Sequence, residues 1–272
     1  MSSNRVLVVH IFSTSYAGST WLNLLLGAHP RAMSVGEIKS ILKVGAAVCT
    51  IHGQDCPVWP GVVLDDPARN IYHQLHTLTG RDTFVVNNSR KYLWAQQSAG
   101  FDQKFIHLVR DGRAIVASHL RKFADRTAWE ASRIWRREVR RNLRLMRRQA
   151  STDVCHVVYE NLKQDTEGQL RRICGFLGLA FDEAMLEFWK ADQHFLGGNR
   201  GTLFSLMKAT GRELPVDPDR RPEGQGPNWD LKYYQDKDPE RFRDERWRTE
   251  LTAGQLRVFS WVGGRLNRRL GY

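Results

Sequence analysis

The sequence has little cysteine, no long apolar run and comparatively few acidic residues. Four cysteines in 272 residues are too few to build a fold on disulfides. No apolar stretch approaches the roughly 18 residues that a membrane-spanning helix needs. The first expected strand begins at Val6, which leaves no room for a signal peptide. We therefore expect a soluble, cytoplasmic protein without a membrane span.

Acidic residues are outnumbered, because 29 Asp and Glu stand against 41 Lys and Arg, and the formal net charge is +12. Such a charge favours an anionic partner: a nucleic acid, an acidic membrane or a small polyanionic cofactor. Charge alone does not choose among these three. The length and the 42% hydrophobic content suit one large core. We expect residues 1–272 to form a single α/β domain.

Four short apolar runs predict the strands of that domain, at residues 6–12, 83–86, 104–109 and 154–159. They are apolar throughout rather than alternating, as parallel strands buried on both faces are. We therefore expect a central, mostly parallel sheet with helices on both faces.

The first strand runs into a turn rich in glycine and hydroxyl groups, STSYAGSTW at residues 13–21, and leucines at helical spacing follow. The free N–H groups and the dipole of a helix N-terminus attract anions, and Gly18 lets the backbone approach a ligand closely. The turn predicts a site for a phosphate-like anion, with an ordinary capped turn as the alternative. It is not a nucleoside-triphosphate P-loop, because no Lys precedes Ser19.

A second anion site is predicted where the strand at 104–109 ends. Arg110 follows that strand, and Ser118 lies about two turns into the helix expected through 114–120. In a strand–turn–helix unit this separation can bring a guanidinium and a hydroxyl onto one phosphate.

Glu37 ends an extended segment, residues 31–38, that can return toward the mouth of the first turn. It is a candidate acid or base. A solvated surface glutamate, or the cap of a helix that starts at Ile38, is the alternative.

Cys49 and Cys56 flank His52 in the stretch CTIHGQDCPVW. A zinc site would need further ligands beyond this pair, and no second cysteine pair accompanies it. We expect a buried thiol pair or a local disulfide, and no metal.

A strongly basic helix is expected at residues 133–148, with one apolar stripe facing the core. A helix that binds nucleic acid is the rival interpretation, but no base-reading motif accompanies it, so we expect no nucleic-acid partner. Prolines among glycines and charges at 201–243 predict a long irregular segment that serves as a lid or substrate loop. An amphipathic helix is expected at 252–266.

These motifs, in this order, resemble the sulfotransferases that use 3′-phosphoadenosine 5′-phosphosulfate (PAPS), in particular their bacterial, carbohydrate-sulfating and tyrosine-sulfating members. YAGSTW at 16–21 is similar to the family motif [KR]SG[ST]TW, which wraps the 5′-phosphosulfate. Arg110 with Ser118 resembles the pair that binds the 3′-phosphate. VVYENL at 157–162, ICGFLGL at 173–179 and HFLGGNR at 194–200 resemble further family segments, and CPVW and DERWR recur there.

The resemblance implies a P-loop-like sulfotransferase fold, PAPS as sulfonate donor with PAP as product, and no metal. It implies that Glu37 is the base and that Trp21 stacks on adenine. Tyr16 and Ser89 complete the catalytic set. The implied cofactor-binding residues are Ser15, Tyr16, Ala17, Gly18, Ser19, Thr20, Trp21, Arg110, Ser118, Tyr159, Asn199 and Arg200.

The sequence departs from the family at Tyr16, where the motif has Lys or Arg. A phenol donates a hydrogen bond but carries no positive charge. Either Arg90, Lys91 or Lys39 supplies that charge, or the enzyme is slow or altered.

The resemblance implies transfer of a sulfonate group to a hydroxyl of a carbohydrate, glycolipid or small-molecule acceptor, with a protein tyrosine also open. A catalytically weak module that binds PAPS or polyanions is one alternative. A P-loop-like small-molecule kinase is the other, although the Walker lysine and a carboxylate for Mg²⁺ are both missing.

Overall fold

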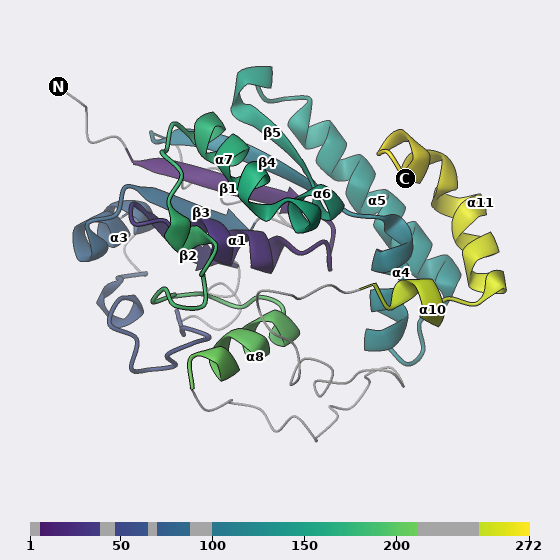
Figure 1. Cartoon of the computed structure of the whole chain (residues 1–272), viewed down its shortest axis with the longest axis horizontal. Coiled ribbons are helices and arrows are strands. Elements are labelled where there is room, and N and C mark those ends of the chain that lie inside the picture. The colour runs from purple at the N-terminus through teal and green to yellow at the C-terminus, as the bar shows by residue number, and fades with distance from the viewer. Residues whose placement is uncertain (1–5, 39–46, 65–69, 88–99, 212–244) are drawn as a thin grey trace.

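The computed structural model describes residues 6–38, 47–64, 70–87, 100–211 and 245–272. Its centre is a parallel sheet of five strands in the order β2-β3-β1-β4-β5 (Figure 1). The strands are β1 (Leu7–Ser13), β2 (Ala32–Gly36), β3 (Thr83–Asn87), β4 (Asp102–Val109) and β5 (Val154–Val158). The predicted α/β architecture is confirmed.

The four predicted strands all form, and β2 is a fifth that was expected only as an extended segment. β1, β2 and β3 are buried almost throughout, as apolar runs in a parallel sheet should be. The edge strand β5 differs, because its residues alternate between buried and exposed positions.

Helices lie between the strands and after the last of them. Their bounds are α1 (Ser19–Gly27), α3 (Ile71–Thr79), α4 (Gly112–Lys122), α5 (Ala128–Met146), α6 (Tyr159–Gln164), α7 (Thr166–Leu177), α8 (Arg200–Ala209), α10 (Trp247–Glu250) and α11 (Ala253–Arg269). Short 3₁₀ turns lie at Trp59–Gly61, Ser151–Asp153 and Glu183–Met185.

The basic helix α5 begins five residues before the predicted start at 133, at Ala128. Thr127 and Glu130 form a capping box there, and each side chain accepts a hydrogen bond from the other residue's backbone N–H. The predicted apolar stripe faces the core, since Trp135, Val139 and Met146 are buried. This stripe fixes which face of α5 carries the arginines.

Helices cover both faces of the sheet, as predicted. α1 contacts β1, β2 and β3, whereas α5 contacts β1 and β4. The C-terminal helix α11 lies along the outer side of α5 (Figure 1). No helix in these described ranges combines the length and the apolarity needed to cross a bilayer.

The segment expected to be irregular from 201 onward is helical at its start. Asn199 caps α8 by accepting a hydrogen bond from the N–H of Thr202, and the helix continues to Ala209. The rest of that expected loop, residues 212–244, lies outside the described part of the chain.

Candidate active site

The chain order of the strands reverses at β1. The first three strands fill one side of the sheet and β4 and β5 the other, so the carboxyl ends of β1 and β4 form a topological switch point. Ligands of open α/β sheets bind at such a point. The predicted turn follows β1 and Arg110 follows β4, so the fold brings the two motifs together.

The turn after β1 leads into α1 without a side-chain cap. Gly18 is the capping residue, with φ of 92° in the left-handed region, and no side chain accepts a hydrogen bond from the first helical turn. The leading N–H groups of a helix have no partner within the helix. The start of α1 therefore suits an anion.

Part of the turn is held by α5, which covers the face of the sheet opposite to α1. The Ser15 N–H donates to Oε2 of Glu138 at 2.9 Å, and the Ser15 hydroxyl lies 3.3 Å from Oε1. Glu138 belongs to α5 and is 9% exposed. This carboxylate orients the turn and engages the side chain of Ser15, which the sequence had assigned to the cofactor.

Tyr16 is the one described residue other than glycine with a positive φ, at 64°. Its ring meets His119 edge to face, with centroids 4.9 Å apart. The ammonium group of Lys122 lies 5.3 Å from the centre of the same ring. A cation from α4 thus lies beside the position where the family motif carries Lys or Arg.

Arg110 joins the two predicted anion sites. Its Nη1 donates to the backbone carbonyl of Tyr16 at 3.0 Å, and its guanidinium lies 4.4 Å from the ring centre of Tyr159. Ser118 lies on α4, where its hydroxyl donates to Ala114 O at 2.9 Å and accepts from Nη2 of Arg121 at 3.0 Å. Arg121 thus contacts Ser118, and its Nη1 pairs with Glu250 of α10.

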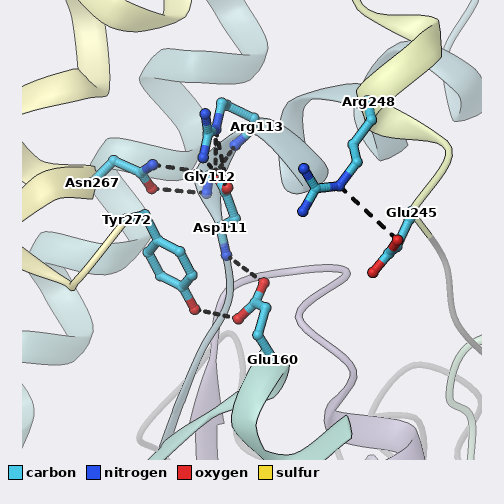
Figure 2. Close-up of polar contacts among 8 residues, drawn as sticks. All are labelled: Asp111, Gly112, Arg113, Glu160, Glu245, Arg248, Asn267 and Tyr272. Carbon is cyan, nitrogen blue, oxygen red and sulfur yellow. Dashed lines mark hydrogen bonds and ion pairs between the residues drawn. The ribbon is translucent and has the colours of Figure 1, made fainter. Parts of the chain in front are cut away.

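The backbone after Arg110 is held by the C-terminus of the chain (Figure 2). Gly112 N–H donates to Oδ1 of Asn267 at 2.9 Å, and Asn267 Nδ2 donates to Asp111 at 3.2 Å. Asp111 N–H donates to Glu160, which also accepts from the hydroxyl of Tyr272. Burial, then the charge of Glu160, raises the pKa of Tyr272. These contacts fix the direction in which Arg110 leaves β4.

Glu37 lies at the carboxyl end of β2 and is half-buried. Its N–H donates to the carbonyl of Leu196 at 2.6 Å, and Leu196 N–H donates to Val35 O at 3.1 Å. Three residues on, Asn199 N–H donates to the hydroxyl of Thr20 at 3.0 Å. One segment, 194–199, therefore contacts both Glu37 and the start of α1.

Several sequence-based assignments lie beyond what the structure describes. Ser89, Arg90, Lys91 and Lys39 fall outside the described residues, and so does the side chain of Arg200, the first residue of α8.

Comparisons with known proteins agree with this geometry. The model of the family described as "Sulfotransferase family" matches residues 102–183, which include β4, Arg110 and the VVYENL segment. A Caenorhabditis briggsae protein named "Putative protein-tyrosine sulfotransferase" is 27% identical over 199 residues, 68% of this chain and 70% of its own. Over these matched residues the chain is thus similar in sequence to sulfotransferases.

Solved sulfotransferase domains share the fold. The domain of the Synechococcus PCC 7002 olefin synthase superposes with a TM-score of 0.63 at 22% identity, covering 100% of this chain and 96% of its own. The domain from the curacin biosynthetic pathway gives 0.57 at 16% identity, covering 95% and 98%. At these identities the likeness concerns the fold.

A small cavity, about 170 Å³, adjoins Arg110. Its lining carries charges of both signs, from Arg113, Lys163 and Arg248 and from Asp111, Glu160 and Glu245. A larger cavity, about 800 Å³, lies at the opposite end of the sheet against Leu7, Thr83 and Asp102. The smaller cavity lies where Arg110 and Tyr159 come together, beyond the carboxyl end of β4.

Sequence reasoning missed Glu138, His119 and Lys122 as neighbours of the turn. Glu138 is separated from Ser15 by 123 positions, and its own helix reads as an ordinary amphipathic segment. One signal was present for Glu138, because it is an acidic residue flanked by arginines next to the apolar stripe.

Proposed function

We propose that the protein transfers a sulfonate group from PAPS to the hydroxyl of a small-molecule, carbohydrate or glycolipid acceptor. The observation that carries the proposal is the hydrogen bond from Arg110 to the carbonyl of Tyr16, at 3.0 Å. It links the uncapped start of α1 to a nearly buried guanidinium, and two separate phosphate groups of one nucleotide need such a pair of anion sites.

The residues present fit that donor. The N–H groups at the start of α1, with Ser19 and Thr20, would hold the 5′-phosphosulfate. Arg110 and Ser118 would hold the 3′-phosphate, and Trp21, partly buried with its ring 5.9 Å from that of Tyr159, offers a surface for adenine. When bound, PAPS supplies an activated sulfonate on a phosphate leaving group.

Glu37 accepts the proton of the acceptor hydroxyl in this proposal, as that oxygen bonds to sulfur and the bond from sulfur to the 5′-phosphate breaks. Its backbone is anchored by Leu196, so the side chain starts from a fixed position at the carboxyl edge of the sheet. The Lys122 ammonium beside Tyr16 offers the positive charge that the phenol lacks.

The decisive experiment compares two nucleotides. PAP should raise the melting temperature and ATP should not, since stabilisation follows ligand affinity. Arg110→Ala should weaken PAP far more than adenosine 5′-phosphosulfate, which has no 3′-phosphate. Equal weakening of both would contradict the assignment of Arg110. Transfer of ³⁵S from PAPS across a panel of sugars, glycolipids, alcohols and tyrosyl peptides then identifies the acceptor.

A second candidate, a PAPS-binding module with little catalysis, is favoured by one observation: Tyr16 in place of the family's cation. PAP binding without ³⁵S transfer to any acceptor on the panel would support it. ATP binding with phosphate transfer would instead support the kinase.

A further inference from the structure

The stretch that contains Cys49, His52 and Cys56 meets the segment Asp192 to His194, far along the chain. Cys49 Sγ lies 3.4 Å from Nδ1 of His52. Cys56 Sγ lies 3.5 Å from Nδ1 of His194, which is separated from it by 138 positions. The donor atoms of Cys49, His52 and Cys56 all lie within 4.8 Å of one another, and those of His52, Asp192 and His194 form a second such group that shares His52.

These distances match those between neighbouring donors around zinc. With Zn–S of about 2.3 Å, Zn–N of about 2.0–2.1 Å and tetrahedral angles, adjacent sulfur and nitrogen donors lie about 3.5 Å apart. Both Sγ–Nδ1 pairs are within 0.1 Å of that spacing. Two thiols and two imidazoles form one of the donor sets typical of structural zinc sites.

The outer atoms of both imidazoles are oriented as metal-ligating histidines are. Nε2 of His52 lies 2.9 Å from one carboxylate oxygen of Asp192, and Nε2 of His194 lies 3.6 Å from the other. A carboxylate on Nε2 keeps the proton there and leaves the lone pair on Nδ1, the atom that faces sulfur. Asp192 therefore orients two candidate ligands at once.

The sulfur of Cys49 is oriented by the backbone of the turn that follows it. The turn after it closes with a hydrogen bond from Gly53 N–H to Cys49 O at 2.9 Å, and Gly53 has φ of 62°. The turn directs the His52 N–H toward Cys49 Sγ at 3.4 Å. Such N–H···S contacts stabilise a thiolate ligand.

The other two cysteines lack this environment. Cys155 contacts the guanidinium of Arg172, and Cys174 contacts the sulfur of Met185. All four cysteines are buried and free of disulfides. Only Cys49 and Cys56, of these four, occur in the described groups of side chains that can hold a metal ion.

We propose that Cys49, His52, Cys56 and His194 bind a structural Zn²⁺ ion, with Asp192 orienting both histidines. Because all four positions are filled by protein, the ion has no open position for substrate and its role is to fix the fold. The proposal is independent of the sulfonate transfer proposed above.

The ion would stabilise the candidate active site through the segment 194–199. Thr50, next to Cys49, donates its N–H to Phe195 O at 2.7 Å and its hydroxyl to Gly197 O at 3.2 Å. Residues 194–199 in turn contact Glu37 and Thr20. Zinc would therefore clamp the 49–59 stretch onto the segment that holds Glu37. Its loss should reach the site through that segment.

The first test measures metal in the whole chain. Protein purified without added metal or chelator should contain one zinc ion per chain, as measured by inductively coupled plasma mass spectrometry. Exchange of Zn²⁺ for Co²⁺ should give intense visible bands of tetrahedral coordination and a thiolate-to-cobalt charge-transfer band in the near ultraviolet. Absence of zinc together with absence of the cobalt spectrum would overturn the proposal, as would a Cys49–Cys56 disulfide found under non-reducing conditions.

Variants then identify the ligands. C49S and C56S should lose zinc, whereas the matched control C174S, another buried free thiol, should keep it. H194Q should lose or strongly weaken the site, and D192N should keep the cobalt spectrum with roughly 10–100-fold weaker affinity. Loss of metal in D192N but not in H194Q would make the carboxylate the fourth ligand and refute the set proposed here.

Unfolding of a cysteine variant does not remove the test, because the native chain supplies a second readout. Zinc should protect Cys49 and Cys56 from alkylation, and a chelator should expose both before Cys155 and Cys174. Equal alkylation of all four thiols with and without chelator would contradict the proposal.

Discussion

Gly18 faces the ring of Tyr159 so closely that a β-carbon added to the glycine would lie 2.6 Å from Cε2 of that ring. Arg110 lies over the same ring, at 4.4 Å from its centre. Tyr159 thus supports both the turn after β1 and the guanidinium after β4. The spacing between these two proposed anion sites depends on one aromatic side chain from the segment that follows β5.

Gly18→Ala should therefore disturb the site. The new methyl group meets Tyr159, and φ of 92° is strained for any residue with a β-carbon. We expect a loss of roughly 1–3 kcal/mol in the free energy of unfolding and at least about tenfold weaker PAP binding, measured by urea denaturation and calorimetry. Gly175→Ala is the control, because its β-carbon would meet no atom within 4 Å and helix propensity should rise. Equal effects of the two changes would contradict the role given to Gly18.

Glu37→Gln should separate catalysis from binding. It removes the proposed proton acceptor but not the backbone hydrogen bond to Leu196. Turnover should fall by roughly 10²-fold or more, while the melting temperature and PAP affinity stay near those of the native protein. Glu167→Gln, an exposed change on α7, should leave turnover unaltered. Normal turnover in E37Q would exclude Glu37 as the base. The alternative bases would then be His10 and His194. His10 is wholly buried within β1, and His194 lies beside Cys56.

Lys122→Met tests the origin of the missing charge. If the ammonium beside Tyr16 stabilises the transferring sulfonate, turnover should fall roughly tenfold or more with a smaller change in PAP affinity. The double variant Tyr16→Lys with Lys122→Met should recover much of that loss, because it returns a cation to the family's position. The exposed Lys190→Met serves as control. A K122M enzyme with unchanged turnover would move the search to the lysines and arginines outside the described residues.

Acid should destabilise the fold through buried histidines. Burial lowers the pKa of His10 to about 4, and burial together with the charge of His156 lowers the pKa of His107 to about 4. Between pH 6.5 and 4 the unfolded chain therefore binds protons that the folded chain does not. The contribution of these histidines to stability is fully present above about pH 6.5, the pKa of a histidine in the unfolded chain. It decreases as the pH falls below that value and stops decreasing near pH 4.

The variant His107→Asn checks this pH dependence. The free energy of unfolding should fall by about 1–2 kcal/mol less between pH 7.5 and pH 5 in this variant than in the native protein, as measured by urea denaturation at both pH values. An identical pH dependence in H107N and the native protein would show that His107 does not contribute.

Local sequence determined most of the framework. The apolar runs at β1, β3, β4 and β5 predicted strands, because a short apolar run is recognisable without knowledge of its partners, even though the edge strand β5 alternates between buried and exposed residues. The turn at 13–21 and Arg110 were also predicted as anion sites from local sequence. The free N–H groups of a helix start and a guanidinium at a strand end are both properties of short segments. The start of α5 was the main error in a helix boundary.

Tertiary structure decided the contacts between distant segments. Glu138 reaches Ser15 across 123 positions, and Asn267 reaches Gly112 across 155. Lys122 comes beside Tyr16 because α4 packs next to the turn after β1, a placement that no local pattern encodes. His194 meets Cys56 only in the folded chain, so the sequence offered two cysteines and one histidine where the fold assembles two cysteines and two histidines. Burial of apolar surface and backbone geometry are local enough to read along a chain, whereas side-chain clusters depend on how the elements pack.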